Sequence, residues 1–140
     1  MLYEEIKLPA AVAMISPWIS LSCDNPSYET NRAADVVLNP EYIRGCAADY
    51  IGDVAVEIAN TENLEFKVFP PVIIMVGTNE ILFDDSMNFY NYIKDIQPKS
   101  TLTIYENQYH VWPLANISSE ASKQALDEIG SFLTLSTELV

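Results

Sequence analysis

The sequence predicts an α/β fold built on a mostly parallel sheet with flanking helices. Two short runs are apolar at every position, residues 11–15 (AVAMI) and 72–76 (VIIMV). Uninterrupted apolarity indicates strands buried on both faces, as in the centre of a parallel sheet. Helical patterns follow the second run and end the chain, and such alternation of strands with helices is typical of α/β proteins.

Three strands are expected. The first, 11–15, stops at Ser16-Pro17, where the proline should hold Ser16 in an extended turn. The second, 72–76, is entered from two prolines and left through a glycine. The third, 101–105 (TLTIY), is rich in the β-branched and aromatic residues that strands favour.

Two helices are expected beside these strands. Residues 84–97 carry apolar side chains at helical spacing and begin with acids, which a helix N-terminus favours; Pro98 should end this helix. Asp84 and Asp85 are therefore expected to cap it. A last helix over about 118–134 should bury one face. That face consists of Ala121, Ala125, Ile129 and Leu133.

Residues 22–69 are less regular. They contain a possible helix at 40–50, after Pro40, and a weakly patterned stretch at 53–66. We expect this segment to cover an edge of the sheet. A long irregular insertion in a compact domain is more often functional or lid-like than idle.

Charge and cysteine content limit the partners and the compartment. The 140 residues include 7 Lys and Arg against 20 Asp and Glu, a formal net charge of −13. Phosphate repels such a surface, which excludes nucleic acid as a partner. Cys23 and Cys46 form neither a disulfide framework nor a metal knuckle, which favours a reduced compartment. The N-terminal residues do not form a secretory signal, and no apolar run approaches the roughly 20 residues of a membrane span. We therefore expect a cytoplasmic protein without a metal.

The positions of the glycines exclude several catalytic loops. There are four glycines, and the closest pair is Gly45 and Gly52. Phosphate-binding and dinucleotide-binding loops need glycines closer together than this pair. A G-x-S-x-G nucleophile elbow also needs a closer pair. The sequence therefore contains no nucleotide-cradling loop and no serine elbow.

An acid and the only histidine follow neighbouring strands. Glu80 comes shortly after strand 72–76, and His110 comes shortly after strand 101–105. Loops beyond the carboxyl ends of parallel strands meet at one rim of the sheet, so we expect the two side chains to lie together. A carboxylate beside an imidazole fixes its tautomer and stabilises its protonated form. The alternatives are that Glu80 is a helix-start acid and that His110 is an ordinary loop residue.

Three spaced motifs resemble the hormone-sensitive-lipase-like branch of the α/β-hydrolases. Ser16-Pro17-Trp18 after an apolar strand is similar to the SPW segment of that branch. The run 71–86 (PVIIMVGTNEILFDDS) is similar to its acid-bearing strand and loop, and His110-Val111-Trp112 to its terminal histidine motif. The family segment between the first two of these motifs is also similar to this sequence, in the order of Asn31, Asp35 and Leu38.

The resemblance implies a carboxylic ester hydrolase that needs no cofactor. It places the acid of a Ser-His-Glu triad at Glu80 and the base at His110, with Asp85 as loop support and as the reserve acid. The oxyanion loop and the serine elbow of the family are not in this sequence. We therefore expect residues 1–140 to be the C-terminal part of one hydrolase domain, with 22–69 as a cap-like insertion and 11–15 at an open sheet edge.

Two functions remain open from the sequence. In the first, the missing N-terminal half is the partner, supplying the nucleophile and oxyanion hole for a small-molecule ester. In the second, the chain is a non-catalytic hydrolase remnant that binds a small apolar ligand or a protein partner.

Overall fold

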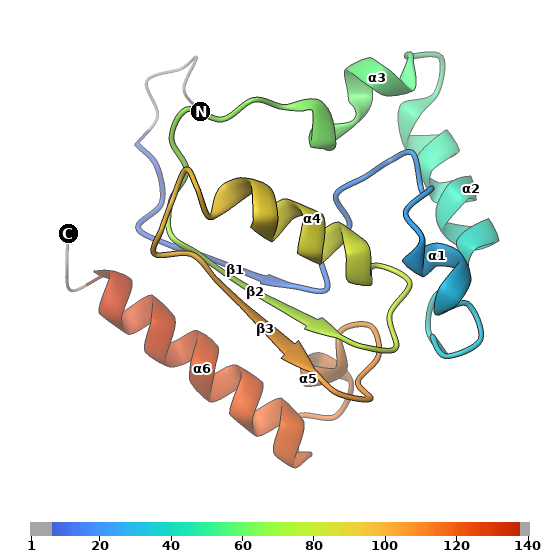
Figure 1. Cartoon of the computed structure of the whole chain (residues 1–140). Coiled ribbons are helices and arrows are strands. Elements are labelled where there is room, and N and C mark those ends of the chain that lie inside the picture. The colour runs from blue at the N-terminus through green and yellow to red at the C-terminus, as the bar shows by residue number, and fades with distance from the viewer. Residues whose placement is uncertain (1–6, 138–140) are drawn as a thin grey trace.

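A computed structural model describes residues 7–137. Its centre is a three-stranded parallel sheet in the order β1-β2-β3 (Figure 1). The strands are β1 (Val12–Ile15), β2 (Val72–Gly77) and β3 (Thr101–Tyr105). The three strands predicted from the sequence are thereby confirmed, and so is the parallel α/β fold.

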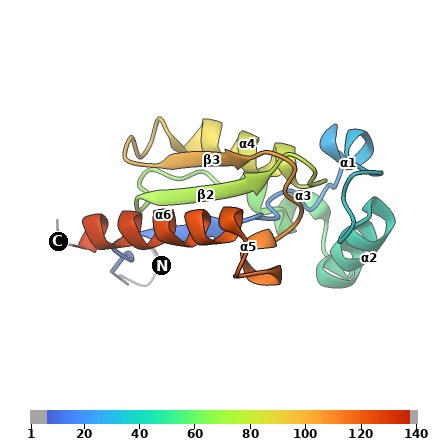
Figure 2. The same ribbon diagram turned by 90° about the horizontal axis from the view of Figure 1, so that it is seen from below.

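Helices cover both faces of this sheet. Helix α4 (Phe83–Ile93) lies on one face, and α6 (Glu120–Thr137) lies on the other, next to the short α5 (Trp112–Ala115). Figure 1 shows the strands between α4 and α6, and Figure 2 looks onto the sheet from the α6 side, with α4 behind the strands. The crossover from β1 to β2 runs through the long segment 16–71, and the crossover from β2 to β3 contains α4.

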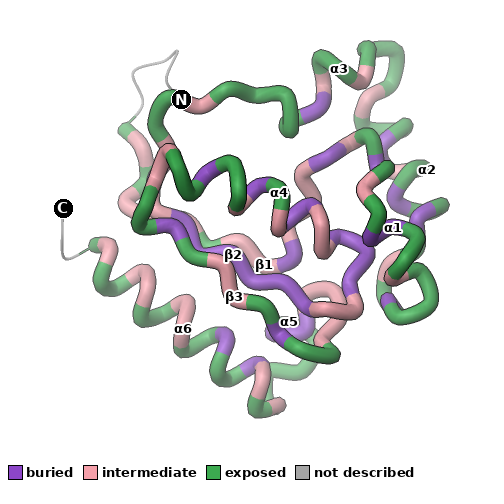
Figure 3. The backbone as a smooth tube through the Cα atoms, viewed as in Figure 1, coloured by how far each residue is buried: buried purple, intermediate pink, exposed green. Residues whose placement is uncertain are grey.

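The core is centred on β2, which is buried at every position. Successive side chains of a strand point to opposite faces of the sheet. The buried residues on the α4 face are Val72, Ile74, Phe89 and Ile93. Those on the α6 face are Ile73, Met75, Tyr105, Trp112 and Ala125. Figure 3 shows the buried tube of β2 inside a largely exposed outer layer.

Strand β1 is an edge strand in the described part of the chain, because it pairs only with β2. Its burial is correspondingly incomplete, and Ala13 is exposed. The uniform apolarity of residues 11–15 therefore predicts the strand correctly but overstates its burial here. The open edge expected for this strand is present among residues 7–137.

The segment between β1 and β2 is more helical than its sequence pattern indicates. It contains α1 (Ser27–Thr30), α2 (Pro40–Ile51), α3 (Val56–Ala59) and a 3₁₀ helix, η2 (Thr61–Asn63). Helices α1 and α2 lie beyond the carboxyl ends of the strands (Figure 1). The predicted helix at 40–50 is confirmed as α2, whose N-terminus is capped by the side chain of Asn39.

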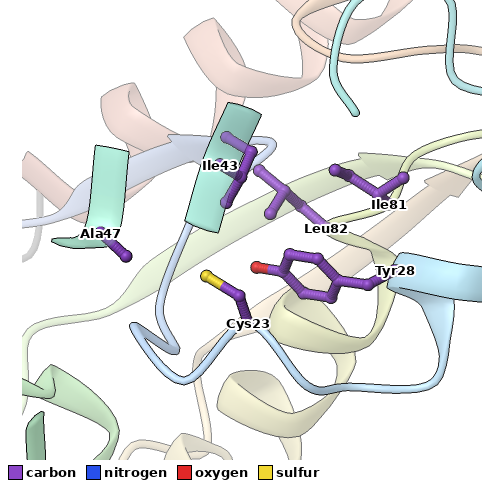
Figure 4. Packing of buried hydrophobic residues seen from close by; sticks show 6 residues of the cluster. All are labelled: Cys23, Tyr28, Ile43, Ala47, Ile81 and Leu82. Carbon is purple, nitrogen blue, oxygen red and sulfur yellow. The ribbon is translucent and has the colours of Figure 1, made fainter. Parts of the chain in front are cut away.

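A hydrophobic cluster attaches this segment to the loop that follows β2. Figure 4 shows Ile43 of α2 beside Leu82 of the β2–α4 loop, with Cys23 and Tyr28 of the α1 region next to them. The cluster consists of Cys23, Tyr28, Ile43, Ala47, Ile81 and Leu82. Burial raises the pKa of both the Cys23 thiol and the Tyr28 hydroxyl, so both stay protonated at neutral pH.

Two helix details differ from the sequence predictions. Helix α4 ends at Ile93, before Pro98, because the chain turns at residues 94–96, where the Ile96 N–H donates to the Ile93 carbonyl. On α6 the packed face continues through Phe132 rather than Leu133. In both cases apolar spacing locates the helix, and local turns and packing set its final contacts.

We predict that Ile74→Ala lowers the free energy of unfolding by about 2–5 kcal/mol, because it opens a cavity at the centre of the sheet. Ile74 is 0% exposed. Ile104→Ala is the matched control, because Ile104 lies on β3 and is 41% exposed; it should cost less than about 1 kcal/mol. Urea unfolding of the three proteins measures both values, and equal losses would contradict this account of the core.

Candidate active site

The structure brings Glu80 and His110 together at the carboxyl ends of β2 and β3. The Nδ1 atom of His110 lies 3.4 Å from Oε2 of Glu80. The Glu80 side chain is 0% exposed and that of His110 is 20% exposed. The pair thus consists of a buried carboxylate and an imidazole that reaches the surface, an arrangement suited to proton transfer with a substrate group.

The other oxygen of the Glu80 carboxylate is held by two donors. Oε1 accepts the Gly77 N–H at 2.6 Å and the Ser16 hydroxyl at 2.8 Å. These two donors fix the orientation of the buried carboxylate and leave Oε2 facing His110. The alternative that Glu80 is a helix-start acid is wrong, because α4 begins at Phe83 and its N-cap is Leu82.

The Glu80 loop is held from outside by the segment that follows β1. The Asn31 amide donates to the carbonyl oxygens of Thr78 at 3.1 Å and Glu80 at 2.7 Å. Asp35 accepts the N–H of Ile81 at 3.0 Å. The sequence shows the order of Asn31 and Asp35 but not these contacts, because their partners are backbone groups that lie more than 40 residues away in the chain.

The histidine loop packs directly onto the end of β2 at Gly77. A Cβ atom at this position would overlap the backbone carbonyl of Gln108. The loops are joined there by backbone hydrogen bonds, including one from Asn79 N–H to Gln108 O at 3.0 Å. Asn107 has φ 59°, a left-handed conformation that asparagine tolerates better than most residues. The histidine loop therefore makes this tight turn with an asparagine and without a glycine.

Asp85, the reserve acid, points to a different loop. Its Oδ1 accepts the backbone N–H groups of Ile19 at 2.9 Å and Ser20 at 2.8 Å, and its Oδ2 accepts the Asn25 amide at 3.0 Å. Burial is the main cause that raises the pKa of Asp85; these hydrogen bonds act in the opposite direction. The carboxylate therefore supports the loop after β1, as the resemblance implies.

Neither acid at the start of α4 caps that helix, so this expectation is wrong. Asp84 instead accepts the N–H of Ser27 at 2.7 Å, at the start of α1. The extended turn expected at Ser16 is also wrong, because Ser16 has φ 51°. Both predictions used local sequence preferences, and contacts with distant segments override those preferences here.

Metal-binding and membrane-spanning features can be assessed for the described part of the chain. Within residues 7–137, no three side chains of His, Cys, Asp or Glu are grouped as metal ligands would be. None of the helices in the same range has the length and apolarity needed to cross a bilayer.

Comparison with known proteins identifies the family. A family model described as alpha/beta hydrolase fold (Abhydrolase_3) matches residues 2–114. Among curated proteins, an acetyl-hydrolase of Streptomyces hygroscopicus is 28% identical over 93% of this chain and 44% of its own length. An esterase of Acinetobacter venetianus is 26% identical over 91% of this chain and 43% of its own length.

Solved structures agree with this family. The esterase EstE5, in crystals soaked with ethyl alcohol, has a TM-score of 0.89 at 31% identity, over 96% of this chain and 46% of that one. An esterase of the bacterial hormone-sensitive lipase family has a TM-score of 0.88 at 30% identity, over 94% of this chain and 45% of that one. The chain therefore belongs to the α/β-hydrolase family, in its hormone-sensitive-lipase-like branch. It spans under half the length of these relatives.

We predict that Gly77→Ala lowers the free energy of unfolding by about 1–3 kcal/mol, because the new methyl group must displace the histidine loop. Gly45→Ala is the matched control: a Cβ at Gly45 meets nothing within 4 Å. It should instead stabilise the chain by about 0.5–1 kcal/mol, since alanine favours the helix. Urea unfolding gives both values, and a neutral Gly77→Ala would show that the close approach of the two loops is not required.

A second prediction concerns pH and Asp85. Its raised pKa means that the folded chain binds the proton more tightly than the unfolded chain does. The associated stability is present at low pH and is lost as the pH rises through the raised pKa. The unfolding free energy of the unmodified chain, measured in urea and referred to that of Asp85→Asn, should therefore fall as the pH rises above the ordinary value of 3.8. If the difference in unfolding free energy between the two proteins does not vary with pH, the raised pKa of Asp85 is contradicted.

Proposed function

We propose that this chain is the C-terminal part of a carboxylic ester hydrolase and that it contributes Glu80 and His110 to a Ser-His-Glu triad. The observation that carries the proposal is the 3.4 Å approach of His110 Nδ1 to the buried Glu80 carboxylate. Membership of a family whose relatives include an acetyl-hydrolase and an esterase supports the reaction class. The substrate would be a small-molecule ester.

In this proposal His110 is the general base. The Glu80 carboxylate accepts a hydrogen bond from the Nδ1–H of His110, which leaves the lone pair of Nε2 free to take the proton of a serine hydroxyl as it attacks the ester carbonyl. The buried carboxylate stabilises the imidazolium formed in this step. The imidazolium then returns the proton to the leaving alcohol, and a water molecule repeats the sequence on the acyl-enzyme.

The serine nucleophile and the oxyanion donors would come from an N-terminal half that completes the hydrolase. No serine elbow or glycine-rich oxyanion loop is encoded in these 140 residues. Oxyanion donors and the nucleophile are among the largest contributions to acyl-transfer rates. The chain by itself is therefore expected to hydrolyse esters at close to the uncatalysed rate.

A second candidate is a non-catalytic module that binds a small apolar ligand. It is favoured by a cavity of about 240 Å³ between α4 and the 61–66 segment, separate from the Glu80–His110 pair. Its walls include the aromatic side chains Phe66, Phe89 and Tyr92. Apolar cavities with a few polar groups are the usual form of small-molecule sites.

Turnover of a short-chain chromogenic ester tests the first proposal. The 140-residue chain is compared with the same chain joined to a polypeptide that carries the serine elbow and is encoded directly upstream of it. We predict turnover in the joined protein only. There Glu80→Gln should lower kcat/KM by about 10⁴-fold, because the amide no longer orients the imidazole correctly. His110→Ala should abolish turnover. Asp85→Asn is the matched control at the reserve acid, and it should lower kcat/KM far less than Glu80→Gln does.

The outcomes separate the assignments. Ester turnover by the 140-residue chain, abolished by His110→Ala, would place a nucleophile within it and overturn the two-part proposal. A large loss in Asp85→Asn but not in Glu80→Gln would make Asp85 the triad acid. The absence of turnover in the folded joined protein would favour the ligand-binding module. A cytoplasmic location stays a prediction.

A further inference from the structure

One serine hydroxyl links the end of β1 to both loops of the candidate site. The Ser16 hydroxyl donates to Glu80 Oε1 at 2.8 Å, and its oxygen accepts the N–H of Val111 at 3.0 Å. Val111 directly follows His110 in the chain. Ser16 is 3% exposed, so little solvent competes for either bond. The hydroxyl thus contacts the carboxylate on one side and the histidine's own loop on the other.

The backbone is strained at both residues that the Val111–Ser16 hydrogen bond joins. Ser16 has φ 51° and Val111 has φ 49°. The left-handed region is unfavourable for residues with a Cβ, and most of all for a β-branched one such as valine. Such conformations persist only where the surrounding structure holds them, and they cluster at functional sites. The strain at both ends of the Val111–Ser16 hydrogen bond indicates that the surrounding packing imposes this contact.

Ser16 is not placed to act as a nucleophile itself. Its proton is donated to the carboxylate of Glu80 rather than to the imidazole, and its side chain is buried. A nucleophilic hydroxyl needs a base within hydrogen-bond reach and access to the substrate. The contacts of Ser16 instead resemble those of a group that fixes the position of its neighbours.

We propose that Ser16 is a positioning residue for the Glu80–His110 pair, an inference that rests on the proposed function. Together with the Gly77 N–H, its hydroxyl occupies Oε1 of Glu80 and leaves Oε2 to face His110. Its bond to Val111 N–H holds the loop that carries the imidazole. Both contacts favour the tautomer with the proton on Nδ1, which keeps Nε2 available as a base.

The tautomer of His110 can be measured without any turnover. His110 is the only histidine in the chain. The ¹⁵N NMR shifts of its ring at alkaline pH therefore report this residue alone. The test compares the unmodified 140-residue chain with Ser16→Ala and Ser16→Gly. Glycine accepts a left-handed backbone readily, so Ser16→Gly removes the hydroxyl while relieving the strain, which favours folding.

Ser86→Ala is the matched control. Ser86 is also buried, but its hydroxyl donates to the Leu82 carbonyl within α4, at 3.4 Å. We predict the Nδ1–H tautomer in the unmodified chain and in Ser86→Ala, and a shift toward the Nε2–H tautomer in both Ser16 variants. An unchanged tautomer in folded Ser16→Gly, or an unmodified chain already in the Nε2–H form, overturns the proposal.

Kinetics of the joined hydrolase give a second readout. Ser16→Gly should lower kcat about tenfold while KM changes by less than about twofold, because the lost hydrogen bond acts on the imidazole rather than on bound substrate. A rise in KM with unchanged kcat overturns the role in turnover. The NMR measurement needs no ester turnover. It therefore decides the effect of Ser16 on the His110 tautomer even if the ester-hydrolase proposal fails.

Discussion

The structure depends on the burial of one carboxylate, that of Glu80. Burying a charge is unfavourable unless hydrogen bonds and an opposite charge replace its water. Among residues 7–137 the Glu80 carboxylate accepts hydrogen bonds from the Gly77 N–H and the Ser16 hydroxyl, and it lies 3.4 Å from Nδ1 of His110. These groups follow or belong to three different strands. The carboxylate can therefore be buried only where the ends of β1, β2 and β3 converge.

The segment between β1 and β2 maintains this convergence from outside. Asn31 and Asp35 bind backbone groups of the loop that carries Glu80, and the hydrophobic cluster around Tyr28 packs on the residues that follow it. Asp85 in turn holds the loop after β1 by accepting the backbone N–H groups of Ile19 and Ser20. A segment that lies outside the sheet thus determines the geometry of side chains at the sheet's rim.

Much of this arrangement could be predicted from sequence, and the reasons for success and failure are physical. Hydrophobic runs locate β2 and α4 because burial determines which residues occupy them, and chain topology alone brings the ends of β2 and β3 to one rim. The contacts of Ser16, Asn31 and Asp85 could not be predicted in this way. Each depends on a partner more than 40 residues away, and local preferences suggested a turn for Ser16 and a helix cap for Asp85.

The open edge of β1 has a consequence for how activity would arise. Ser16 is the first residue after β1, so a strand paired with the edge of β1 that is open among residues 7–137 would lie beside the strand that carries the Ser16 hydroxyl to Glu80. Pairing at the sheet edge and alignment of the Glu80–His110 pair are then thermodynamically linked. In a completed hydrolase, the alignment of the Glu80–His110 pair would therefore depend on whether the strand next to β1 pairs with it in the correct register.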